Sequence, residues 1–70
     1  MQIEVFKTNV KTKKKADLVI NLIKEIVPVG KINFDLEDRD KILRIEAKEI
    51  QVEPILDLLT NSGFTCIPLE

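Results

Sequence analysis

Residues 31–47 read Lys-Ile-Asn-Phe-Asp-Leu-Glu-Asp-Arg-Asp-Lys-Ile-Leu-Arg-Ile-Glu-Ala and have the pattern of a β-hairpin. The first six of these residues alternate strictly between polar side chains and Ile32, Phe34 and Leu36, which predicts a half-buried strand. Residues 37–40 are polar and few enough to form a hairpin turn. Residues 41–47 predict the returning strand, with three side chains inward and three outward: Leu43, Ile45 and Ala47, then Ile42, Arg44 and Glu46.

Two amphipathic segments flank this hairpin. Between residues 13 and 27, apolar side chains recur at helical spacing, at positions 16, 19, 20, 23, 26 and 27. We expect Thr12 to be the N-cap of this helix, and Pro28 and Gly30 to end it. A second helix should contain Pro54 in its first turn, where the missing N–H is harmless, and should end at Gly63.

The two ends of the chain predict two more strands. Residues 2–7 alternate, and we expect Ile3 and Val5 to face the core. Phe6 then falls on the polar side, where it is either exposed or covered by a loop. Residues 64–69 predict the last strand, which should lie at a sheet edge because Pro68 cannot donate a hydrogen bond to a neighbour.

The predicted order is therefore β-α-β-β-α-β. Residues 19–23 (Val-Ile-Asn-Leu-Ile) resemble residues 55–59 (Ile-Leu-Asp-Leu-Leu), which indicates two similar βαβ halves. Two such halves with right-handed crossovers give an α+β fold, the ferredoxin-like split βαβ sandwich. We expect a single domain over residues 1–70, with a four-stranded antiparallel sheet, both helices on one face and the other face open.

Composition restricts the partners of the chain. The net charge of −1 argues against a general nucleic-acid-binding protein, and no apolar run approaches the roughly 20 residues that cross a bilayer. The single cysteine, Cys66, excludes an internal disulfide and fits a reducing compartment. The start of the chain lacks the pattern of a signal peptide. These features predict a cytoplasmic protein that binds neither nucleic acid nor membranes.

Two segments resemble the heavy-metal-associated domain of copper chaperones and of the cytoplasmic tails of metal-pumping ATPases. Residues 32–37, Ile-Asn-Phe-Asp-Leu-Glu, resemble that family's Val-x-Val-x-Leu-Glu strand. Residues 55–64, Ile-Leu-Asp-Leu-Leu-Thr-Asn-Ser-Gly-Phe, resemble its helix that ends in Gly-Tyr or Gly-Phe. The likeness covers nearly the whole chain and implies the same split βαβ scaffold.

The metal motif of that family, Met-x-Cys-x-x-Cys, is not present here. Counting back from Val29 without gaps places Val10 at the Met position, Thr12 at the first Cys and Lys15 at the second. Soft metals such as Cu(I) need sulfur ligands, and a lysine ammonium repels a cation. The resemblance therefore implies the scaffold without its metal-carrying activity, and we expect no cofactor.

The segment 6–16, Phe-Lys-Thr-Asn-Val-Lys-Thr-Lys-Lys-Lys-Ala, joins the first strand to the first helix. Residues 1–15 carry five lysines and one glutamate, a net +4, whereas the remainder carries −5. Lysines in a first helical turn oppose the helix dipole, and a broken local rule often marks a functional site. Lys11, Lys13, Lys14 and Lys15 are therefore candidates for binding an anion or an acidic partner. The alternative is a solvated helix end that keeps the domain soluble.

Catalysis has little support in the sequence. There is no histidine, and Ser62 is the only serine, so no nucleophile and base can be paired. We expect a non-enzymatic interaction module that binds a protein partner, either an acidic one or a second copy. The candidate association surface is the open sheet face, with Phe6, Ile42, Arg44 and Ile67. Two alternatives remain: a metal carrier that uses Cys66 across a dimer, and a sensor of small anions at the lysine segment.

Overall fold

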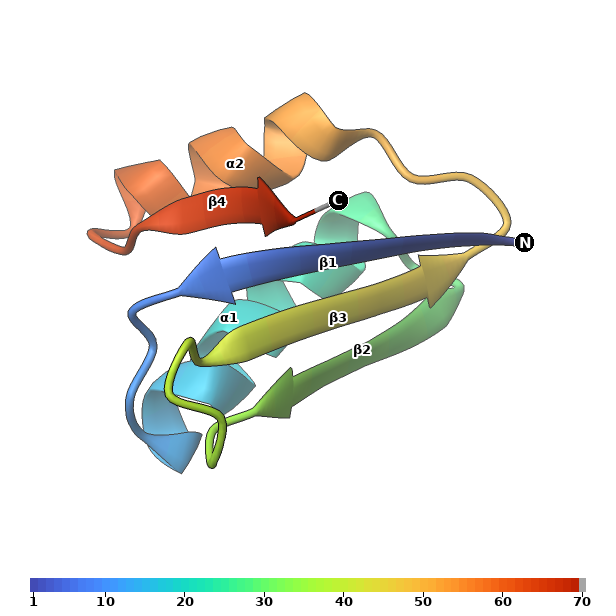
Figure 1. Ribbon diagram of the computed structural model, residues 1–70. Helices are drawn as coiled ribbons and strands as arrows, with labels where there is room; N and C mark the ends of the chain where they lie inside the picture. The colour runs from blue at the N-terminus through green and yellow to red at the C-terminus, as the bar shows by residue number, and fades with distance from the viewer. Residues whose placement is uncertain (70) are drawn as a thin grey trace.

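The computed structural model describes residues 1–69 (Figure 1). Its elements follow one another as β1 (Gln2–Thr8), α1 (Lys13–Ile26), β2 (Gly30–Asp35), β3 (Ile42–Ala47), α2 (Val52–Asn61) and β4 (Cys66–Leu69). The four strands form one antiparallel sheet in the order β2-β3-β1-β4. The predicted βαββαβ order is confirmed, and β4, which contains Pro68, lies at an edge as expected.

Both helices lie on the same face of the sheet, and the opposite face carries no further element of the described chain (Figure 1). The core forms between the sheet and the helices. Its largest fully buried side chains come from two strands, one loop and both helices: Phe6, Val10, Val19, Ile23, Leu43, Ile45, Ile55 and Leu59. Because α1 packs on β2 and α2 packs on β4, the two helices cover opposite edges of the sheet.

The register of β1 corrects one prediction. Phe6 lies opposite Leu43, and Leu43 lies opposite Phe34, so these three side chains share the helix-covered face. Phe6 is 0% exposed, whereas Ile3 is 47% exposed on the opposite face. The expectation that Ile3 and Val5 face the core was therefore wrong. Both alternating sets of β1 contain apolar residues, so the alternation alone does not decide which set faces the helices, and the register with β3 places Phe6 beside Leu43 in the core.

Gln2 lies on the helix-covered face, where its side chain makes two hydrogen bonds to the main chain of Ile50. Its side-chain Nε2 donates to the Ile50 carbonyl at 3.1 Å, and its Oε1 accepts from the Ile50 N–H at 3.1 Å. A single carboxamide thus satisfies both main-chain groups of a buried loop residue. Gln2 at the start of β1 is thereby hydrogen-bonded to the loop between β3 and α2.

The helix ends follow the predicted chemistry. Thr12 is the N-cap of α1, and its Oγ1 accepts from the Lys15 N–H at 3.2 Å. Gly63 follows the end of α2 with φ of 89°, a left-handed conformation in which glycine is favoured. Gly30 begins β2 where space is short, because an added Cβ would lie 2.7 Å from the Glu46 carbonyl oxygen.

Candidate functional site

The open face of the sheet carries a group of aliphatic side chains over β1, β3 and β4. Ile3 and Val5 come from β1, Ile42 from β3, and Ile67 and Leu69 from β4. Val5 lies directly opposite Leu69, and Lys7 lies between Ile42 and Ile67. Ile67 is 53% exposed and Leu69 is 40% exposed. We call these five residues the aliphatic patch.

The other half of the open face, over β2 and β3, is charged. Lys31 lies opposite Glu46, and Asn33 lies opposite Arg44. Arg44 and Glu46 form an ion pair at 3.1 Å along β3. The charged side chains therefore lie mostly over β2 and β3, and the aliphatic ones lie mostly over β1 and β4. Ile42 of β3 lies between Lys7 and Asp35. An apolar area bordered by charge is typical of a surface that contacts another protein.

The sequence predicted part of this surface. The structure places Ile42, Arg44 and Ile67 on the open face and Phe6 in the core, so the prediction that Phe6 belongs to an association surface was wrong. Ile3, Val5 and Leu69 are the members that sequence reasoning missed. Leu69 could have been found, because it alternates in phase with Ile67. The two β1 residues could not be found, because the phase of that strand was assigned incorrectly.

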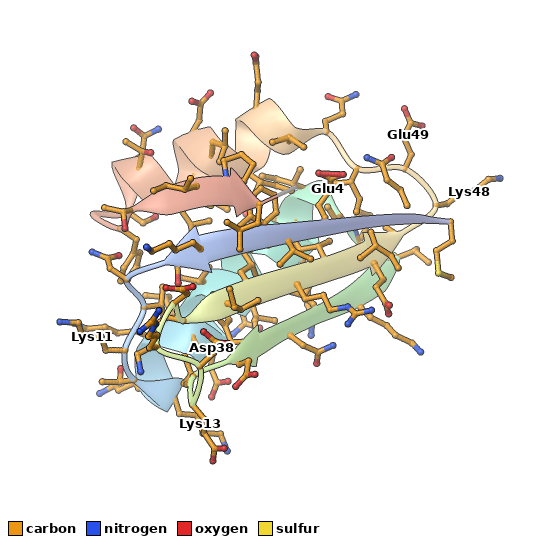
Figure 2. All side chains as sticks on the ribbon, in the orientation of Figure 1. Glu4, Lys11, Lys13, Asp38, Lys48 and Glu49 are labelled. Carbon is orange, nitrogen blue, oxygen red and sulfur yellow. The ribbon has the colours of Figure 1, made fainter. Side chains whose placement is uncertain are left out.

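Residues 6–16, which we call the basic segment, contain Lys11, Lys13, Lys14 and Lys15, and all four of these lysines lie on the surface. Lys13, Lys14 and Lys15 occupy the first turn of α1, which contains no acidic residue, and Lys11 precedes its N-cap. The ion pairs within residues 1–69 are Lys7–Asp40, at 3.6 Å, and Arg44–Glu46, and neither includes one of these four lysines. Figure 2 shows Lys11 and Lys13 at the same end of the molecule as Asp38. The basic segment and the acidic turn between β2 and β3 therefore lie at one end of the molecule.

Thr8 joins this acidic turn to the basic segment. It is the one buried polar residue within residues 1–69. Its N–H donates to the Asp40 carbonyl at 3.1 Å, and its Oγ1 donates to the Lys41 carbonyl at 2.6 Å. The same Oγ1 accepts from the Val10 N–H at 3.2 Å. A threonine at the end of a strand gave no signal in the sequence, because its role depends on a turn more than thirty residues away.

Thr12 and Lys15, at the positions where the resembling family has cysteines, are neighbours in space. The N-cap hydrogen bond from the Lys15 N–H to Thr12 Oγ1 joins them. In this chain Thr12, at the position of that family's first cysteine, caps α1. Lys15, at the position of the second cysteine, carries an exposed ammonium group. Neither side chain can supply a thiolate.

Cys66 is a free cysteine at the start of β4. It lies opposite Thr8 and packs partly buried against the core, on the helix-covered side of the sheet. Burial raises the pKa of its thiol to about 11. A thiol with so high a pKa is almost entirely protonated at neutral pH, so it is a weak nucleophile and a weak metal ligand.

Within residues 1–69, no three His, Cys, Asp or Glu side chains gather closely enough to hold a metal ion. Neither helix in the described part of the chain is long and apolar enough to cross a bilayer. Comparison of the sequence with protein-family models, with curated proteins and with solved structures gives no match.

Proposed function

We propose that this chain is a non-enzymatic protein-interaction domain and that the aliphatic patch of its open sheet face is the binding surface. One observation supports the proposal: Ile3, Ile67 and Leu69 lie 40–53% exposed on adjacent strands, with no helix over them. Each aliphatic side chain fully removed from water contributes about 1.5–3 kcal/mol. Burial of this group against a partner is therefore the largest binding contribution that the surface offers.

The partner that fits this surface is a protein with an apolar ridge and a mixed-charge border. The five aliphatic side chains would form the centre of the contact. Arg44 and Glu46 would form the polar rim, where charges direct orientation more than they add affinity. Lys7, between Ile42 and Ile67, would place one charge inside the contact. The scaffold resembles the heavy-metal-associated domain, and this proposal keeps the scaffold while assigning no metal-carrying role to it.

Isotope-labelled protein provides the test. A partner is isolated from extract on the immobilised domain and titrated into the labelled chain. The proposal predicts that the amide signals of Ile3, Val5, Ile67 and Leu69 shift together. Shifts confined to the lysines of residues 11–15 would contradict it and favour an anion or acidic-partner site at the start of α1.

A further inference from the structure

The outer edge of β2 differs from the other sheet edge. β2 pairs only with β3 within the described chain, and it presents six residues without a proline. The opposite edge, β4, has four residues, of which one is Pro68. Unpaired main-chain groups at an edge are a template for another strand, and proline at an edge blocks such pairing. Of the two edges, only β2 has both the length and the donors for a continuous ladder.

The charges of β2 are arranged symmetrically about its centre. Lys31 and Asp35 are both exposed on the open face, two positions before and two positions after Asn33. If two copies of β2 pair antiparallel with Asn33 opposite its own copy, Lys31 of each copy lies opposite Asp35 of the other. Opposite charges at directly facing positions stabilise a pair of strands, and like charges destabilise it. With the centre at Ile32, Lys31 faces Asn33 and no opposite charges meet within β2. With the centre at Phe34, Lys31 faces Glu37, which lies beyond the end of β2, and Asp35 faces Asn33. Only the register centred on Asn33 pairs Lys31 and Asp35 within the strand.

The helix-covered side of β2 is complementary in the same register. Ile32 faces Phe34 of the second copy, and Gly30 faces Leu36, so each larger side chain meets a smaller one. Phe34 and Leu36 are only half-buried, although they pack against the core. With Ala16 and Ile20 of α1 they line a shallow groove along this edge. A second copy would cover these partly exposed apolar groups.

We propose that two copies of this chain form a homodimer by pairing their β2 strands antiparallel about a twofold axis at Asn33. The result is a continuous sheet of eight strands with all four helices on one side. Lys31 then lies between Glu46 of its own chain, which it already faces, and Asp35 of the second copy. The two aliphatic patches stay uncovered on the opposite side, one near each outer end of the sheet.

This inference goes beyond the proposed function, because β2 and the aliphatic patch are different surfaces. Ile67 lies on β4, at the other edge of the sheet from β2. Loss of one contact leaves the other intact, so the two proposals fail separately.

Disulfide trapping tests the register, in a Cys66→Ser background that removes the native thiol. Asn33→Cys places two thiols opposite each other at the axis, where facing Cβ atoms lie about 4.5–5.5 Å apart. Lys31→Cys is the matched control, because the two copies of residue 31 are offset by four residues, about 13 Å. The proposal predicts a covalent dimer under mild oxidation for Asn33→Cys and a much smaller yield for Lys31→Cys. Equal yields from the two variants, or none from either, would overturn it.

Sedimentation of the unmodified chain tests the charges independently. The wild type should have twice the chain mass at high protein concentration. Lys31→Asp places like charges opposite each other and should dissociate the dimer at that concentration. Lys48→Asp makes the same charge change at an exposed position outside β2 and should leave the dimer unchanged. A monomeric wild type, or a Lys31→Asp variant as dimeric as Lys48→Asp, contradicts the proposed pairing.

Discussion

The hydroxyl of Thr8 donates a 2.6 Å hydrogen bond to the carbonyl oxygen of Lys41, the one non-glycine residue of the described chain with a positive φ, at 48°. Lys41 in turn donates from its Nζ to the Leu36 carbonyl at 2.8 Å. These contacts hold the turn between β2 and β3 against the end of β1. The acidic turn and the basic segment before α1 are thereby fixed at one end of the sheet, away from Lys48 and Glu49 at the other end (Figure 2).

Replacing Thr8 with valine tests the contribution of this contact. The change keeps the shape of the side chain but leaves the Val10 N–H and the Lys41 carbonyl without their hydroxyl partner. Loss of a buried hydrogen-bonding partner costs about 1–3 kcal/mol of unfolding free energy. Thr60→Val, on the exposed surface of α2, should change stability by less than about 0.5 kcal/mol. Urea denaturation of the two variants measures the difference, and equal midpoints would contradict this role for Thr8.

The lysines at the start of α1 should lower the stability of the isolated domain. Replacing Lys13, Lys14 and Lys15 with glutamine removes positive charge from the positive end of the helix dipole. The free energy of unfolding should therefore rise at low salt, by less than about 1 kcal/mol for each lysine replaced. Lys24→Gln is the opposing control, because Lys24 lies in the last turn of α1 and its loss should destabilise the domain. Thermal melts at low and high salt distinguish the two effects, which should both shrink as salt screens the charges. A triple variant that melts no higher than wild type at low salt means that the lysines carry no such cost.

Cu(I) binding of the kind known from the heavy-metal-associated domain should require two thiols at the positions of Thr12 and Lys15. We expect the wild-type chain to bind neither Cu(I) nor Zn(II) tightly with a defined stoichiometry, because Thr12 and Lys15 supply no thiolate. In the Thr12→Cys/Lys15→Cys variant, the N-cap geometry places the two residues next to each other and should create a two-thiolate Cu(I) site. Thr12→Cys/Lys14→Cys is the control, with the second thiol on another side of the helix. Competition with a Cu(I) chelator measures the affinities. Retention of Cu(I) by the wild type would instead support the alternative that Cys66 carries metal.

The pH dependence of stability should include a contribution from Cys66. Burial raises the pKa of its thiol from 9.0 to about 11 in the folded chain. A group whose folded pKa is raised stabilises the fold fully below the unfolded pKa and loses that contribution as pH rises through the folded pKa. Between about pH 9 and 11, the wild type should therefore lose more stability than Cys66→Ala, in which this titration is absent. If the melting temperatures of the two proteins fall equally with pH over that range, the fold does not hold Cys66 protonated.

The hairpin of β2 and β3 shows what sequence periodicity predicts well. Ile32 and Phe34 alternate with polar residues on one strand, and Leu43 and Ile45 do so on the other, so one phase in each strand directs these four side chains toward the helices. Ile42 is the apolar residue of β3 that this phase leaves on the open face. In β1 the pattern is ambiguous, since Ile3 and Val5 compete with Phe6 for the core. The structure resolves this ambiguity through the register with β3, which periodicity within one strand does not contain.

The candidate site was harder to predict for the same reason. Ile42 and Ile67 could be placed on the open face because the phases of β3 and β4 were clear, whereas Ile3 and Val5 depended on the phase of β1. The symmetry of Lys31 and Asp35 about Asn33 is visible in the sequence, but it gains meaning only when β2 is known to be an edge strand.

The most direct test of the interaction surface compares two lysine substitutions at equally exposed aliphatic residues. Ile67, 53% exposed, lies in the aliphatic patch, and Leu18, 55% exposed, lies on α1 on the other side of the molecule. The affinity of the isolated partner for Ile67→Lys and Leu18→Lys is measured by calorimetry beside the wild type. We expect Ile67→Lys to weaken binding at least tenfold, about 1.4 kcal/mol, and Leu18→Lys to bind as the wild type does. Unchanged binding by Ile67→Lys, or equal loss in both variants, would contradict the assignment of the open sheet face as the binding surface.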